Sequence, residues 1–159
     1  MPRTVKPESQ YVLKVSLRGS RGIWRRIVMQ GAQSLDDLHE EIFHAFGRHE
    51  EHLYSFYLPQ PEARGRDRLR DAEEYSHPMA ATGSGLDDDI GGGDARKARL
   101  QSLRLRAGQR FEYLFDFGDS WWHDILVEEV RPAGGDSSFL GVVEKRGRAP
   151  RQYPEELDE

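Results

Sequence analysis

Two histidines and two acidic residues are the side chains of this sequence whose types could carry chemistry together. His39 and Glu40 are adjacent in SLDDLHEEIFHAFG, and Asp119 and His123 lie in FEYLFDFGDSWWHDILVEEV. Imidazole and carboxylate groups act as general acids and bases, and both bind metal ions. A metal-binding or hydrolytic site built from these four residues is therefore one hypothesis, and it requires the two segments to meet in the fold.

The same two histidines also fit a purely structural role. His39 recurs at helical spacing with apolar residues, and His123 falls on the apolar face of a predicted hairpin. A buried imidazole is normally neutral and hydrogen-bonded. We favour this second interpretation, in which both histidines belong to the core. It assigns no catalytic residue, and it leads us to expect no metal, no cofactor and no enzymatic activity.

Familiar catalytic motifs fail in this sequence at identifiable positions. The chain of 159 residues contains no cysteine, which excludes disulfides, thiolate nucleophiles and cysteine-ligated metal sites. DFG at 116–118 lacks the glycine-rich and catalytic loops of a protein kinase. HEEIFH at 39–44 is one residue longer than the zinc motif HExxH, so its histidines diverge on a helix.

The net charge of −5 is unevenly distributed along the chain. Residues 1–26 contain seven basic residues and one acid, and residues 96–106 contain five basic residues and no acid. Arginine contacts phosphate, and tryptophan can stack on a base. The candidate nucleic-acid contacts are Arg18, Arg21, Trp24, Arg25 and Arg26, joined by 96–106 if the two clusters are adjacent. The competing interpretation is a packed tryptophan beside solvated arginines.

A third class of function is a protein–protein interaction module. Trp122 falls on the mixed face of the predicted hairpin, opposite to the core face. Exposed tryptophans are frequent anchors of protein interfaces. Trp122 is therefore the candidate partner-binding residue, while the identity of any partner and the oligomeric state stay open. The sequence has no apolar run of a signal peptide or a membrane span, so we expect a cytoplasmic protein.

The elements that must position these residues can be predicted from periodicity and turn residues. Alternating apolar residues and a glycine-rich turn predict a hairpin at 10–29, and LYSFYL at 53–58 predicts a further strand. Ser34 and Asp37 have the spacing of a capping box at the start of a helix, and Gly47 is a suitable end.

The remaining segments carry weaker signals. Residues 59–94 are rich in proline, glycine, arginine and aspartate, so we expect a long, partly mobile excursion with a short strand or turn near Glu74. Residues 148–159 are polar and contain two prolines, which predicts a flexible tail. The sequence therefore predicts a single domain over 1–147.

The hairpin around FGDSWWH has a preferred register. A loop of the three residues Gly118, Asp119 and Ser120 places Phe117 opposite Trp121 and Phe115 opposite His123. Phe111, Tyr113, Phe115 and Phe117 then share one aromatic face. A loop of two residues would mix the faces, because a slip of one position moves every side chain to the other face.

Three ordered motifs resemble the plasmid pRiA4b Orf-three-like family over most of residues 10–146. They are the IWRR strand (Ile23–Arg26), the LHE helix (Leu38–Glu40) and the DFGDxWxH hairpin (Asp116–His123). The resemblance implies association with plasmids and with passenger genes of insertion elements, some of which carry a resolvase-like label. It implies no catalytic residue set. Longer members continue into a cysteine-containing segment, which this chain lacks.

The predicted elements and the resemblance together indicate an α+β fold. In it, a small, mostly antiparallel sheet built from hairpins packs on one main helix. The expected function is a non-catalytic binding or adaptor domain of a plasmid- or mobile-element-associated family, which contacts an anionic partner such as nucleic acid through a basic strand face. The alternatives are the histidine-based site and the protein–protein module.

Overall fold

The alternating apolar residues near the N-terminus form an antiparallel hairpin in the computed structural model of the chain. Strand β1 (Ser9–Leu17) pairs with β2 (Ser20–Gln30). The side chains that alternate along β1 are buried: Tyr11, Leu13, Val15 and Leu17. The hairpin predicted at 10–29 is therefore confirmed. The structure describes residues 9–81, 93–132, 140–150 and 152.

Helix α1 (Leu35–Ala45) begins and ends where its capping residues predict. Ser34 Oγ accepts from the Asp37 amide at 3.1 Å, and Asp37 Oδ2 accepts from the Ser34 amide at 2.9 Å, which completes a capping box. Gly47 follows with a φ of 69°, a left-handed conformation that glycine adopts without strain. Within the described ranges, no helix is long and apolar enough to cross a bilayer.

Strands β6 (Arg110–Phe115) and β7 (Trp121–Pro132) form the second hairpin, in a register that differs from the predicted one. Phe115 lies opposite Trp121 and Tyr113 opposite His123, so the loop comprises residues 116–120. The predicted three-residue loop, with Phe117 opposite Trp121, is therefore wrong by two positions.

Asp116 ends strand β6 earlier than the apolar pattern indicates. It has a φ of 63°, and its Oδ1 accepts from the amides of Gly118 and Asp119 at 3.1 and 3.3 Å. Its carbonyl accepts from the Ser120 amide at 2.6 Å. These bonds within the loop replace cross-strand bonds at Phe117. Because the shift is even, the paired side chains keep their predicted faces, but Phe117 is left 42% exposed.

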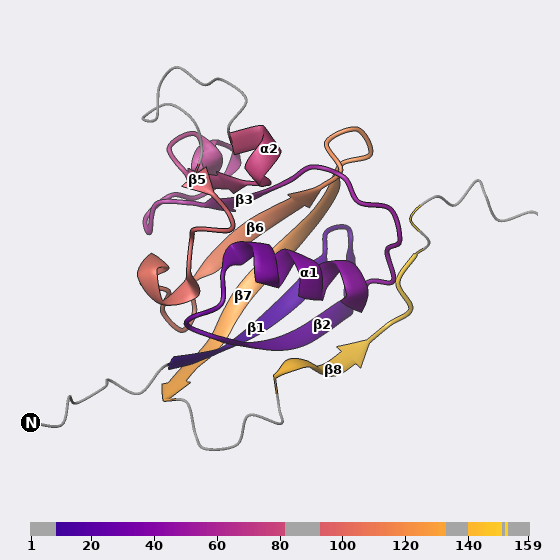
Figure 1. Ribbon diagram of the computed structural model, residues 1–159, viewed down its shortest axis with the longest axis horizontal. Coiled ribbons are helices and arrows are strands. Elements are labelled where there is room, and N and C mark those ends of the chain that lie inside the picture. The colour runs from indigo at the N-terminus through magenta and orange to yellow at the C-terminus, as the bar shows by residue number, and fades with distance from the viewer. Residues whose placement is uncertain (1–8, 82–92, 133–139, 151, 153–159) are drawn as a thin grey trace, which may run out of the picture.

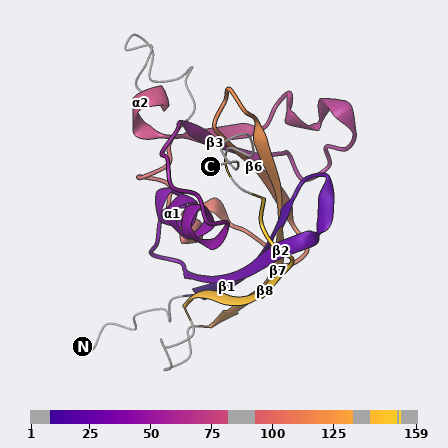
Figure 2. The same cartoon turned by 90° about the vertical axis from the view of Figure 1, so that its right-hand side faces the viewer.

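One sheet joins the two hairpins. Strand β3 (Tyr54–Leu58) pairs with β6 and with β4 (Glu73–Ser76), and β5 (Gly93–Asp94) pairs with β4. At the other edge, β8 (Gly141–Arg146) pairs with β2. The order is β5-β4-β3-β6-β7-β1-β2-β8, with β1 joining the hairpins through β7. Figures 1 and 2 show this sheet curving around α1, which covers one of its faces.

Short helical turns lie in the connections between these strands. They are η1 (Arg66–Leu69), α2 (Pro78–Ala81) and η2 (Leu100–Leu103). The segment that we predict as an excursion, 59–94, contains η1, β4, α2 and β5, while residues 82–92 lie outside the described part of the chain. The weak strand signal near Glu74 corresponds to β4.

The predicted fold class, α+β with a small, mostly antiparallel sheet, is wrong. The described part of the chain is mostly sheet, and the eight strands within it form a mixed sheet because β4 and β5 pair in parallel. The strands that have a weak signal or none in the sequence are short and mostly polar: EEYS in β4, GD in β5 and GVVEKR in β8. They have no apolar alternation of their own and join the sheet through backbone pairing with its edges.

Alanine substitutions at Phe115 and Phe117 test the register of the second hairpin. Phe115 is fully buried, so Phe115→Ala leaves a cavity and should lower the free energy of unfolding by about 3–5 kcal/mol. Phe117 is 42% exposed, so Phe117→Ala should cost less than about 1 kcal/mol. Urea unfolding followed by tryptophan fluorescence measures both values. Equal losses at the two positions would contradict the loop at 116–120.

Candidate functional site

His39 lies on the buried face of α1 and is held on three sides. Its Nδ1 is 2.6 Å from Tyr113 Oη, and its Nε2 is 3.1 Å from Glu51 Oε2. The Tyr54 ring stacks on the imidazole with centroids 4.0 Å apart, and Tyr54 Oη donates to Asp36. Burial lowers the pKa of His39 to about 4, so the ring is neutral. Tyr113 Oη donating to Nδ1 and Nε2–H donating to Glu51 satisfies both nitrogens.

His123 is fully buried beside a second polar group, the guanidinium of Arg48. Arg48 Nη2 donates to His123 Nε2 at 2.9 Å, which places the imidazole proton on Nδ1, 3.4 Å from the Tyr113 carbonyl. Burial, together with the Arg48 charge, holds the pKa of His123 well below its usual value. Burial also lowers the pKa of Arg48, to about 10.

Arg48 is enclosed by aromatic rings. Its Cζ lies 5.2–5.3 Å from the ring centroids of Phe46, Phe115 and Trp121, and the residue is 7% exposed. Among the described residues, Arg48 Nη1 and Trp121 Nε1 are buried without a hydrogen-bond partner. Cation–π contact with the rings offsets part of the cost of burying this charge.

The structure brings only part of the predicted histidine site together. His39 Nε2 lies 3.9 Å from Glu40 Oε1, while His39 and His123 contact Tyr113 at centroid distances of 6.0 and 5.0 Å. Asp119 is exposed in the loop 116–120, and no contact among the described residues joins it to either histidine.

The sequence analysis missed Arg48 and Glu51, which contact the two histidines. Both lie in the polar segment that follows α1, and such a segment is typical of a solvated loop. Gln152, within the predicted tail, accepts from the amides of His49 and Glu50 at 2.9 and 3.2 Å. Its own amide donates to the Glu50 carbonyl at 2.9 Å, so this segment is fixed by contacts distant in sequence.

Three of the four arginines predicted to contact nucleic acid have partners within the protein. Arg25 is buried and donates to the carbonyls of Ala45, Trp24 and Arg146 at 2.8–2.9 Å. Arg18 forms ion pairs with Glu112 and Asp124, and Arg26 forms them with Glu128 and Glu144. Arg21 lies on β2, but its side chain is outside the described part. Their role in binding nucleic acid stays a prediction.

The two candidate tryptophans lie half-buried on the sheet face opposite to α1. Lys14 Nζ and Arg26 Cζ each lie 4.9 Å from the Trp24 ring centroid. Arg18 Cζ lies 4.8 Å from the Trp122 ring, and the Tyr57 ring is 5.6 Å away. Both indoles therefore pack against cationic side chains of neighbouring strands.

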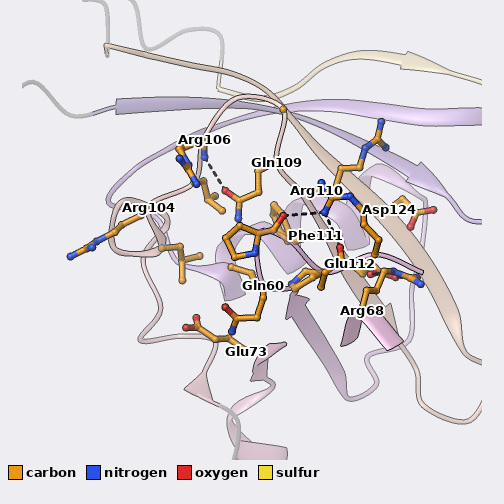
Figure 3. Close-up of a pocket in the computed structure, with 18 of the residues that line it drawn as sticks. Gln60, Arg68, Glu73, Arg104, Arg106, Gln109, Arg110, Phe111, Glu112 and Asp124 are labelled. Carbon is orange, nitrogen blue, oxygen red and sulfur yellow. Dashed lines mark hydrogen bonds and ion pairs between the residues drawn. The ribbon is translucent and has the colours of Figure 1, made fainter. Parts of the chain in front are cut away.

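A groove of about 1640 Å³ opens beside the start of β6. It is lined by parts of β1, β6 and β7, by the connection between β3 and η1, by Arg68 of η1, by Glu73 of β4 and by residues 103–109. Figure 3 shows Arg104 and Arg106 on one side of the groove, and Arg68, Glu112 and Asp124 on the other. Six basic residues line it: Lys14, Arg64, Arg68, Arg104, Arg106 and Arg110.

The carboxylates of the groove neutralise few of these charges. The three acidic lining residues are Glu73, Glu112 and Asp124. Glu112 accepts from Arg68 Nε at 2.8 Å and also pairs with Arg18, which pairs with Asp124 as well. Within the described part of the chain, no carboxylate pairs with five of the basic residues: Lys14, Arg64, Arg104, Arg106 and Arg110.

The two basic clusters of the sequence, at 1–26 and 96–106, are adjacent in part, because both contribute residues to the groove. Arg104 and Arg106, from the 96–106 cluster, line the same groove as Lys14 from the first cluster. The one aromatic residue in the lining is Phe111, which is fully buried. The groove therefore offers positive charge and no exposed ring on which a base could stack.

Comparison with known proteins agrees with the resemblance carried by the three motifs. The sequence model of the family described as plasmid pRiA4b ORF-3-like protein matches residues 9–155. The uncharacterized protein y4hQ of Sinorhizobium fredii is 34% identical over 132 residues, which cover 80% of this chain and 57% of that protein. The chain thus spans little more than half the length of this relative.

A solved structure shares the fold. The crystal structure of MM3350, a protein of unknown function from Methanosarcina mazei Go1, superposes with a TM-score of 0.71. The match covers 91% of this chain and 74% of that one at 22% sequence identity. The overall fold of this chain is therefore one that an experimentally solved protein also adopts.

His39 and His123 are neutral in the folded protein, so we expect the fold to lose stability in acid. Once unfolding exposes them, they bind protons below a pKa of about 6.5. The unfolded chain then binds more protons than the folded one, so the free energy of unfolding should fall as the pH drops from about 6.5 toward 4. The slope should reach about 1.4 kcal/mol per pH unit for each histidine.

Urea titrations at about pH 7.5, 6.5 and 5.5 measure this slope. His44, whose side chain is 72% exposed, provides the control, because His44→Ala should leave the slope unchanged. A free energy of unfolding that stays constant over this range would show that the folded protein binds these protons as well.

Proposed function

This chain belongs to the plasmid pRiA4b ORF-3-like family, and we propose that it is a non-catalytic, cytoplasmic binding domain whose groove holds the phosphate backbone of nucleic acid. The observation that carries the proposal is the charge of the groove lining. Among the described residues, five basic side chains of the lining have no carboxylate partner, and Glu73 is the one lining acid without a basic partner, on a chain whose net charge is −5. Such a local excess attracts a polyanion in spite of the net charge.

The kind of contact follows from the side chains present. Arginine presents planar N–H donors that match phosphate oxygens, and Arg104, Arg106 and Arg110 are exposed at the groove. The lining has no exposed aromatic ring, so reading of unstacked bases has no support there. The proposed contact is therefore with the backbone and independent of base sequence.

Arg18 lies beside the groove, but its ion pairs with Glu112 and Asp124 neutralise its charge, so it adds no free cation to the proposed contact. Arg25 adds none either, since three carbonyls already use its guanidinium. The name of the family links it to a plasmid, which is compatible with a nucleic-acid partner as an association and supplies no mechanism.

Salt dependence of binding tests the proposal. Fluorescence anisotropy with labelled duplex and single-stranded DNA should show binding at low salt that weakens steeply as salt is added. The triple variant Arg104→Ala, Arg106→Ala, Arg110→Ala removes three phosphate contacts. It should weaken binding at least about ten-fold, and the slope of log K against log salt should become shallower by about 2–3.

A second triple variant controls for the change in net charge. Arg96→Ala, Lys145→Ala and Arg148→Ala remove three exposed basic side chains that lie outside the groove lining. This variant should bind nearly as well as the wild type. If the two triple variants lose the same affinity, or if the wild type binds neither probe at low salt, the groove is not a nucleic-acid site.

A further inference from the structure

We infer that His39, Glu40 and Glu51 form a binding site for one divalent transition-metal ion, with Zn²⁺ the best match. The site lies on the helix side of the sheet and shares no residue with the groove lining. Three ligand atoms, one imidazole nitrogen and two carboxylate oxygens, lie within 4.8 Å of one another. The inference is independent of nucleic-acid binding.

The separations of the ligand atoms are close to those of a zinc site. His39 Nε2 lies 3.1 Å from Glu51 Oε2 and 3.9 Å from Glu40 Oε1. In a tetrahedral zinc site with metal–ligand bonds of about 2.0–2.2 Å, neighbouring ligand atoms are about 3.3–3.6 Å apart. The side chains of Glu40 and Glu51 are 49% and 54% exposed, so small rotations about their own bonds can close the difference.

His39 is positioned before any ion binds. The stacked Tyr54 ring and the Tyr113 hydroxyl fix the plane of the imidazole, and Nε2 faces the two carboxylates. A metal-ligating histidine usually has such a partner on its other ring nitrogen. When the ion binds, the ring proton moves from Nε2 to Nδ1 by exchange with water, and Nδ1–H then donates to Tyr113 Oη, so the imidazole stays neutral.

The charges around His39 also favour a cation. Glu40 and Glu51 approach each other, and Asp36 acts electrostatically on both His39 and Glu51. Three carboxylates beside a neutral imidazole repel one another, and a divalent ion between two of them relieves this repulsion. In addition, His44 Nε2 lies 3.7 Å from the other oxygen of Glu40.

The donor set selects the kind of metal. Imidazole is a poor ligand for Mg²⁺ and Ca²⁺, whereas one imidazole with two carboxylates suits Zn²⁺ and its neighbours in the first transition row. Three protein ligands leave a fourth tetrahedral position for water.

Isothermal titration of the tag-free full chain with Zn²⁺ tests the inference. The wild type should bind one ion per chain in a saturable way. Glu40→Gln and Glu51→Gln keep the size of each side chain and should weaken binding by about ten-fold or more. Glu50→Gln is the matched control, because Glu50 is exposed, adjacent in sequence and not a ligand, so its affinity should equal that of the wild type.

The nitrogen resonances of His39 give a second readout that surface binding would not change. Addition of Zn²⁺ to the wild type should shift the Nε2 signal and move the ring proton to Nδ1. The inference is overturned if Zn²⁺ shows no saturable binding, or if Glu51→Gln binds as tightly as Glu50→Gln. Nucleic-acid binding by both variants should stay unchanged, so the two proposals can fail separately.

Discussion

The burial of Tyr113 between two histidines is the constraint on which the rest of the structure depends. Its hydroxyl meets His39 on α1, and its ring and carbonyl meet His123 on β7. These polar groups have no access to water, so each must find its partner inside the fold. That requirement sets how α1 lies on the hairpin. It thereby sets where the segment after α1, with Arg48 and Glu51, can pass.

Ion pairs, and not buried hydrogen bonds, organise the face of the sheet opposite to α1. Pairing of β2 with β8 places Arg26 opposite Glu144, and Arg18, which follows β1, forms an ion pair with Asp124 of β7. Arginines in the connecting loops, such as Arg104 and Arg106, have no strand neighbour to pair with. The strand pair is rich in basic residues in the sequence, yet Arg18, Arg25 and Arg26 have partners within the protein. Arg104, Arg106 and Arg110 at the groove have no carboxylate partner among the described residues. Charge counted along the chain and charge available to a partner are therefore different quantities.

The two proposed sites use these two environments in opposite ways. The groove depends on exposed, flexible cations whose attraction for phosphate weakens with salt. The cluster around His39 depends on one rigid, buried ligand with two adjustable carboxylates at its surface. A histidine held in one orientation fixes the position of a bound metal ion. Exposed arginines can instead contact phosphates of a nucleic-acid backbone in many conformations.

The sequence by itself determined the elements that carry their own local signals: the first hairpin, the capped helix α1, strand β3 and the aromatic face of the second hairpin. Apolar alternation and capping residues act over a few positions, so they can be recognised in the sequence without knowledge of the fold. Tertiary structure alone decided the rest. The strands β4, β5 and β8 are polar and form by pairing with an existing edge, and Asp116 moved the hairpin register through bonds within its own loop. The partners of His39 and His123 were likewise hidden, because Glu51 and Arg48 lie in a polar segment whose position depends on contacts distant in the chain.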